Sequence, residues 1–97
     1  MDICYYIDPN TELPHIYNHD VAEQDVEDIL YNSGEDRQGH DGSRIAIGQT
    51  SAGRYLRVIY VPDPEPGGIF VVTAYEMTAK ALAAYKRRRK KKGGNKS

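Results

Sequence analysis

Two strand-like runs that are separated by only three residues constrain the fold of this chain more than any other feature. Residues 43–50 (SRIAIGQT) and 54–61 (RYLRVIYV) are rich in β-branched and aromatic residues, which favour β-strands. The connection between them, Ser51, Ala52 and Gly53, is short enough only for a hairpin. The pattern therefore predicts that an antiparallel sheet forms the centre of the fold.

Two further runs extend this predicted sheet. Residues 3–7 (ICYYI) have strand composition, and residues 68–74 (GIFVVTA) follow a Pro- and Gly-rich segment that cannot pair as a strand. A short edge strand at 36–40 is also compatible with the sequence. We predict an α+β fold that contains an antiparallel β-meander sheet of about four strands.

An acidic N-terminal helix and a basic C-terminal helix are predicted to cover the sheet. Residues 21–31 carry apolar side chains at i, i+4, i+7 and i+8 with acidic residues on the other faces, which is typical of an amphipathic helix. Asp20 and Glu23 have the spacing of a capping box at its start. Thr78 is a suitable N-cap for a last helix at 79–90, which ends in a basic run.

The assignment of strand faces decides where these helices pack, because a shift of one residue exchanges the faces of a whole strand. A hairpin loop with an even number of residues gives one apolar face, on which we place both helices. That face carries Ile45, Ile47, Leu56, Val58 and Tyr60, and the other carries Arg44, Ala46, Gly48, Tyr55, Arg57 and Ile59. The second face is flat and cationic, which suits an RNA backbone. The alternative is that Arg44 and Arg57 are ordinary solvent-facing residues.

The charges of the chain are divided between its two halves. Residues 1–36 contain ten acidic residues and no Lys or Arg, for a formal charge of −10. Residues 37–97 contain 13 Lys and Arg against four acidic residues, for a formal charge of +9, and include the run KRRRKKK at 86–92. Because charge acts locally in salt, we expect the second half to bind a polyanion although the net charge is −1. The alternative is that both charged helices serve only solubility.

Several classes of function lack support in the sequence. His15, His19, His40 and Cys4 do not have metal-site spacing, and no nucleotide-binding or nucleophile motif occurs, so we expect no metal and no cofactor. No stretch is apolar enough to span a membrane, and the start lacks the features of a signal peptide. We therefore expect a cytoplasmic, reduced protein with one domain at 1–90 and a disordered basic tail at 91–97.

The order of several short motifs resembles the BrnT branch of the RelE-like ribonuclease toxins of bacterial toxin-antitoxin modules. The segments are YID, NHDV, SRIAIGQTSAGRYLRVIYV and FVVTAYEMT, and the likeness covers residues 3 to about 90. Asp8 stands eleven residues before His19, as in that family. The chain departs from the family where Tyr75 and Glu76 replace a pair of arginines, and where Pro14 interrupts the first helix.

The resemblance implies an endoribonuclease that cleaves RNA without a metal, through attack of the ribose 2′-hydroxyl on the adjacent phosphorus. Such a reaction needs a base, cations near the phosphate and an acid. The implied catalytic residues are Arg44, Arg57, His19, Tyr75 and Glu76. Tyr75 and Glu76 leave their strand on opposite faces, so only one of them is expected to join Arg57.

The implied RNA-binding residues are mostly basic and lie in the second half of the chain. They are Arg37, Arg54, Tyr55, Lys80, Lys86, Arg87, Arg88 and Arg89. The expected partners are RNA and a small cognate antitoxin protein. Two other readings stay open: a nucleic-acid-binding or protein-interaction module without catalysis, and a basic tail that acts as a nuclear-localisation-like signal. For His19, the alternative is a side chain that only supports the start of the acidic helix.

Overall fold

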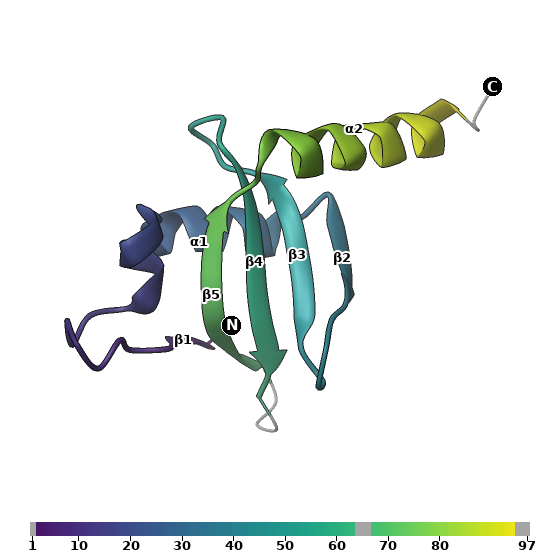
Figure 1. Cartoon of the computed structure of the whole chain (residues 1–97). Helices are drawn as coiled ribbons and strands as arrows, with labels where there is room; N and C mark the ends of the chain where they lie inside the picture. The colour runs from purple at the N-terminus through teal and green to yellow at the C-terminus, as the bar shows by residue number, and fades with distance from the viewer. Residues whose placement is uncertain (1, 64–66, 95–97) are drawn as a thin grey trace.

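The computed structural model describes residues 2–63 and 67–94, with side chains described as far as Lys90. Its described part forms a five-stranded sheet, two α-helices and one short 3₁₀ helix (Figure 1). The elements are β1 (Asp2–Tyr5), η1 (His15–His19), α1 (Glu23–Tyr31), β2 (Glu35–Gln38), β3 (Arg44–Gln49), β4 (Tyr55–Pro62), β5 (Gly68–Glu76) and α2 (Ala79–Gly94). The predicted α+β class is confirmed.

The sheet has the strand order β1-β5-β4-β3-β2. Strands β2 to β5 form an antiparallel meander, whereas β1 pairs with β5 in parallel at one edge. The sheet thus has one strand more than the four that we predicted, because the edge segment near residue 36 does pair as β2. Its sequence, EDRQ, is polar, and an edge strand of this kind carries no alternating apolar signal.

The register of the β3–β4 hairpin differs from our prediction by one residue. Ala46 pairs with Val58 and Ile47 pairs with Arg57, so that the loop between the strands runs from 50 to 54 and has an odd number of residues. The amide of Thr50 donates to the carbonyl of Arg54 at 2.7 Å and closes this loop. The predicted grouping of Ile45 and Ile47 with Leu56, Val58 and Tyr60 is therefore wrong.

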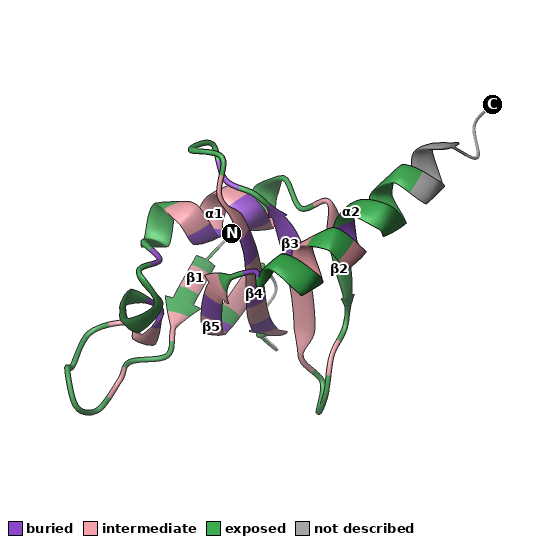
Figure 2. Ribbon diagram, turned by 45° about the horizontal axis from the view of Figure 1, so that its top comes forward, coloured by how far each residue is buried: buried purple, intermediate pink, exposed green. Residues whose placement is uncertain are grey.

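The main core lies between the sheet and α1. Val26 and Ile29 of α1 are fully buried against Leu56 and Val58 of the sheet, and Ile16 of η1 closes the same core (Figure 2). Because each buried aliphatic side chain contributes roughly 1.5–3 kcal/mol, this face supplies most of the apolar burial.

The start of α1 differs in detail from the prediction. The helix begins at Glu23, and the backbone amide of Ala22 donates to the carboxylate of Asp25 at 3.0 Å. The predicted box of Asp20 and Glu23 does not form, because Asp20 ends η1 with a left-handed φ of 58°. The segment after Pro14 forms only the short helix η1.

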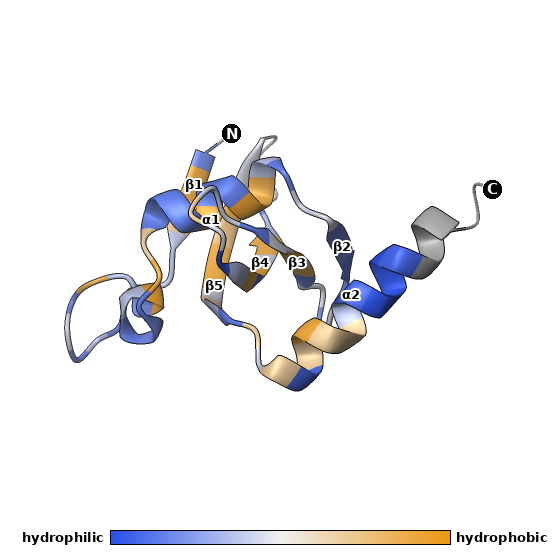
Figure 3. Ribbon diagram, turned by 90° about the horizontal axis from the view of Figure 1, so that it is seen from above, coloured by the Kyte–Doolittle hydropathy of each residue, from blue (hydrophilic) through white to orange (hydrophobic). Residues whose placement is uncertain are grey.

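Helix α2 packs on the opposite face of the sheet from α1, as the view from above shows (Figure 3). Its apolar first half packs on Ile47 of β3. Ile47, Met77 and Tyr85 form a second, smaller buried cluster there. The hydroxyl of Thr78 accepts from the amide of Ala81 at 3.1 Å, which confirms the predicted N-cap.

The prediction that both helices share one face is wrong, because the odd hairpin loop places Ile47 on the face away from α1. The basic second half of α2 projects past β2 (Figure 1) and continues to Gly94, beyond the predicted end at Lys90. Of the predicted disordered tail at 91–97, residues 95–97 lie outside the described residues. No helix in the described ranges has the length and apolar character that crossing a membrane requires.

Candidate functional site

Arg44 and Arg57 lie on opposite faces of the sheet. Arg44 pairs across the strands with Tyr60 on the face of α1, whereas Arg57 pairs with Ile47 and with Tyr75 on the face of α2. The predicted cationic platform that joins the two arginines is therefore wrong, for the same reason as the predicted core. Any site must be built around one of them.

Arg44 is engaged by the fold. Its Nε donates to Oδ1 of Asp36 at 2.8 Å, and its Nη2 donates to the backbone carbonyl of the same residue at 3.2 Å. The hydroxyl of Tyr60 donates to the other carboxylate oxygen at 2.5 Å. The Asp36 carboxylate raises the pKa of Arg44, whereas the pKa of Tyr60 is raised first by burial and then by this carboxylate. Arg44 therefore ties β2 to β3 instead of presenting a free cation.

Arg54 and Glu76 also belong to the face of α1. Nη1 of Arg54 donates to the carbonyl of Asp20 at 2.8 Å and lies 3.6 Å from the carboxylate of Asp25. Its Nη2 lies 3.4 Å from the carboxylate of Glu76. The sheet separates this ion-pair cluster from Arg57. Glu76 is therefore not in position to serve as a base beside Arg57.

Three of the predicted catalytic residues do come together on the face of α2. Arg57 and Tyr75 are half-buried partners on β4 and β5, which places their side chains side by side. The exposed ring of His19, at the end of η1, contacts the ring of Tyr75 edge-on with 6.0 Å between centroids. We call His19, Tyr75 and Arg57 the His-Tyr-Arg group.

A second imidazole adjoins this group. The ring of His15 lies 5.2 Å from that of His19, and the ring of Tyr6 lies 5.9 Å beyond His15. Both histidines belong to η1, which packs against β5. We did not predict a catalytic role for His15, although its spacing of four residues from His19 was visible in the sequence.

Asp8 holds His15 from the other side. Its carboxylate accepts from the amide of Asn10 at 2.8 Å and from the side chain of Asn18 at 2.6 Å, and it lies 3.5 Å from Nδ1 of His15. The first of these hydrogen bonds, followed by the second, lowers the pKa of Asp8. The carboxylate is thus fixed in its ionised form, and it restricts the orientation of the imidazole.

Arg57 has no carboxylate partner within the described ranges. Its Nε is buried and has no hydrogen-bond partner there, and the same holds for Oγ1 of Thr73. Thr73 faces the same side of the sheet, because it pairs with Ile59 next to the Arg57–Tyr75 pair. Native proteins rarely leave buried polar atoms unpaired. These two atoms therefore mark a place where a polar ligand can supply a hydrogen bond.

The predicted RNA-binding residues of α2 differ in how far the fold engages them. Arg88 makes two hydrogen bonds to the carboxylate of Glu35, both at 2.9 Å, and Arg89 donates to the carbonyl of Gly34 at 2.6 Å. The ammonium of Lys86 lies 5.1 Å from the centre of the half-buried Tyr55 ring. Lys80 and Arg87 are exposed and have no ion pair in the described part of the chain, and Arg37 on β2 lies 3.8 Å from Glu35.

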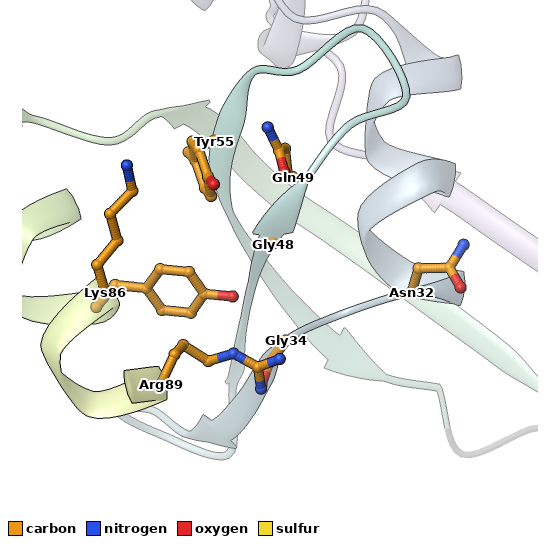
Figure 4. Close-up of a pocket in the computed structure, with 8 residues that line it drawn as sticks. Asn32, Gly34, Gly48, Gln49, Tyr55, Lys86 and Arg89 are labelled. Atoms are coloured by element: carbon orange, nitrogen blue, oxygen red, sulfur yellow. The ribbon is translucent and has the colours of Figure 1, made fainter. Parts of the chain in front are cut away.

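A polar pocket of about 330 Å³ opens between α2 and the adjoining ends of β3 and β4 (Figure 4). We call it the helix pocket. It is lined by Asn32, Gly34, Gly48, Gln49, Tyr55, Tyr85, Lys86 and Arg89. Tyr85 is buried, and its pKa is raised chiefly by this burial. The pocket does not include any member of the His-Tyr-Arg group.

In comparisons with known proteins, no family model, no curated protein and no solved structure matches this chain. Across residues 2–63 and 67–94, the structure contains no cluster of three or more His, Cys, Asp or Glu residues that could hold a metal ion. The functional interpretation therefore rests on the geometry of the His-Tyr-Arg group and on the charges of α2.

Proposed function

We propose that the protein is a toxin-like endoribonuclease that binds RNA on the α2 face of its sheet. The observation that carries this proposal is the position of His19, Tyr75 and Arg57 on one accessible face. An imidazole, a phenol and a guanidinium are the groups that proton transfer and charge stabilisation at a phosphate require. A small cognate antitoxin that covers this face is the expected protein partner.

The proposed cleavage needs only groups of this chain. His19 removes the proton of a ribose 2′-hydroxyl, and the 2′ oxygen then forms a bond to the adjacent phosphorus. The bond from phosphorus to the 5′ oxygen breaks, and the leaving oxygen receives a proton from His15. The products carry a 2′,3′-cyclic phosphate and a 5′-hydroxyl.

The two remaining side chains assist this step. Arg57 balances the negative charge that develops on the phosphate oxygens. Its interaction with the phosphate is therefore stronger in the transition state than in the bound substrate. The ring of Tyr75 stacks on a base of the RNA and holds the strand beside His19. Asp8 is a positioning residue, because it contacts the His15 ring and not the substrate.

The test is induced expression in a bacterium, followed by mapping of RNA ends, with purified protein assayed on the RNA that is cut. His19→Ala should lower the rate by at least about 100-fold, because general acid–base catalysis contributes factors of this size. His40→Ala is the matched control, since His40 is exposed in the β2–β3 turn. A chelator should not change the rate. Unchanged cleavage by the folded His19→Ala variant would refute this site.

A second function, RNA binding without cleavage, is favoured by one specific observation. Glu76, one of the implied catalytic residues, lies across the sheet from Arg57 and near Arg54. In that case RNA should stay intact, and its affinity should fall steeply with salt because the contacts are mainly to phosphates. Intact RNA with salt-dependent binding in the wild-type protein would favour this second function over the first.

A further inference from the structure

We infer that the helix pocket binds a phosphate group, in a site separate from the His-Tyr-Arg group. The phosphate can belong to a nucleotide or to an RNA strand, because both present the same anionic oxygens. This inference does not require cleavage, so it can hold where the proposed function fails. It rests on the shape, the charge and the hydrogen-bonding groups of the pocket.

Glycine at position 34 keeps the pocket open. A Cβ there would collide with the hydroxyl of Tyr85 and would lie 3.3 Å from the guanidinium carbon of Arg89. The volume of about 330 Å³ lies at the lower end of the range for ligand pockets, roughly 300–1,000 Å³. Its size thus suits one phosphate with part of a nucleotide and not a larger ligand.

The lining of the pocket is positive, and the nearby carboxylate of Glu35, which acts on the lining residue Tyr85, is bound by Arg88. None of its eight lining residues is Asp or Glu, and no carboxylate in the described part of the chain lies within ion-pair distance of Lys86 or Arg89. Arg88, between them in sequence, is paired with Glu35, and the pocket lining does not include either residue. Lys86 and Arg89 repel each other as like charges on one side of the pocket, and an anion bound there would reduce this repulsion.

The donors of the pocket are also held in place before a ligand arrives. Arg89 is fixed by its bond to the Gly34 carbonyl at 2.6 Å, and Lys86 lies over the Tyr55 ring at 5.1 Å from its centre. In Figure 4, the side chain of Lys86 reaches from α2 toward Tyr55, whereas that of Arg89 reaches toward Gly34. Guanidinium and ammonium groups are the usual partners of phosphate oxygens.

A second pocket also contains an arginine, but its charge is already neutralised. It has about 320 Å³ and lies at the start of α1, where Arg54 contacts the carboxylate of Asp25. Its cation is already neutralised, and Asp20 and Asp25 line it. An anion would be repelled there, so we assign phosphate binding to the helix pocket and not to this one.

The experiment is a nuclear magnetic resonance titration of the full chain with inorganic phosphate, with 5′-AMP and with a short RNA. The test variant is Lys86→Gln/Arg89→Gln. The matched control is Arg87→Gln/Lys90→Gln, which removes the same charge from two exposed positions of α2 outside the pocket. A second test variant, Gln49→Glu, adds a carboxylate to the pocket without a change in α2.

We expect saturable shifts of the Gly34 and Gly48 amides in the wild-type protein. The affinity for phosphate and for 5′-AMP should fall at least about tenfold in both test variants, because each charge-assisted contact contributes roughly 1.5–3 kcal/mol. The control should change it less than about twofold. RNA that shifts the same amides would identify a strand phosphate as the ligand, whereas shifts with 5′-AMP alone would identify a free nucleotide.

Two results would overturn the inference. One is an equal loss in the test and control variants, which would indicate general attraction to a basic helix. The other is an absence of saturable shifts at Gly34 and Gly48 with any of the three ligands. Cleavage by the same variants is measured in parallel, so that failure of the helix pocket is separated from failure of the His19 site.

Discussion

The two faces of the sheet have different construction. On the α1 face, Leu56 and Val58 are fully buried and the two arginines, Arg44 and Arg54, are bound by carboxylates. On the α2 face, the buried cluster is smaller and Arg57 has no carboxylate partner in the described ranges. One face therefore stabilises the fold, and the other retains groups that a ligand can use.

This difference shows where the acidic and basic halves of the sequence meet in the fold. The acidic first half supplies Asp25 and Asp36, which neutralise arginines of the second half across the α1 face. The cations that remain unpaired are those near α2, including Lys86 and Arg87. The acidic half thus restricts the available positive charge to one side of the molecule.

The largest effect should come from the core of the α1 face. Leu56→Ala should lower the free energy of unfolding by about 3–4 kcal/mol, because it leaves a cavity among fully buried side chains. Leu82→Ala, on the α2 face, should cost only about 1–2 kcal/mol, since Leu82 is partly buried. Urea denaturation measures both. Equal losses would show that the two faces contribute equally to stability.

The next effect concerns ligand binding and compares two arginines of one sheet. Arg57→Gln should weaken RNA binding roughly 10- to 100-fold, because a charge-assisted contact to phosphate is lost. Arg44→Gln should change the affinity less than about twofold, since Arg44 already binds Asp36 on the other face. Binding is measured by fluorescence anisotropy with a labelled RNA. A larger loss for Arg44→Gln would place the RNA on the α1 face.

Most elements of this fold were predictable, because each of them has a local cause, whereas the polar edge strand β2 has no such signal. The composition of 43–50 and 54–61 predicted the hairpin, the apolar stripe predicted α1, and Thr78 marked the start of α2. The faces were not predictable, because they depend on whether the 50–54 loop counts as odd or even. Nothing in the sequence shows that Thr50 and Arg54 belong to the loop and not to the strands that flank it.

The candidate site was likewise predictable only where local structure determines it. The separation of Tyr75 and Glu76 onto opposite faces was predicted correctly from the alternation of a strand, whereas the structure shows that Tyr75 is the one that pairs with Arg57. The contact of His19 with Tyr75 was not predictable from spacing, because it depends on how η1 packs against β5. His15 and Asp8 were missed for the same reason, since their pairing arises in an irregular segment.

A smaller effect should appear in the pH dependence of stability. Burial raises the pKa of Tyr85 on the α2 face, so the unfolded chain loses this proton first as the pH rises above about 10. Its contribution to stability is present below that pH and is lost as the pH rises toward the higher value of the folded protein. Tyr85→Phe should therefore make the decline above pH 10 less steep, as measured by urea denaturation at several pH values. If stability declined above pH 10 as steeply in Tyr85→Phe as in the wild-type protein, the role assigned to Tyr85 would be contradicted.

The smallest effect concerns the exposed ion pair that attaches α2 to the sheet edge. Arg88→Gln should lower the free energy of unfolding by only about 0.2–1 kcal/mol, because the Arg88 side chain is 40% exposed and its pairing with Glu35 is screened. The loss should shrink further in 1 M salt, where the Debye length is about 3 Å. Arg87→Gln, which removes the same charge without a described partner, should have no measurable effect. Arg88→Gln could instead lower the free energy of unfolding as much as Leu82→Ala does. In that case ion pairing, and not the apolar cluster, would hold α2 on the sheet. The two faces would then differ in charge as well as in packing.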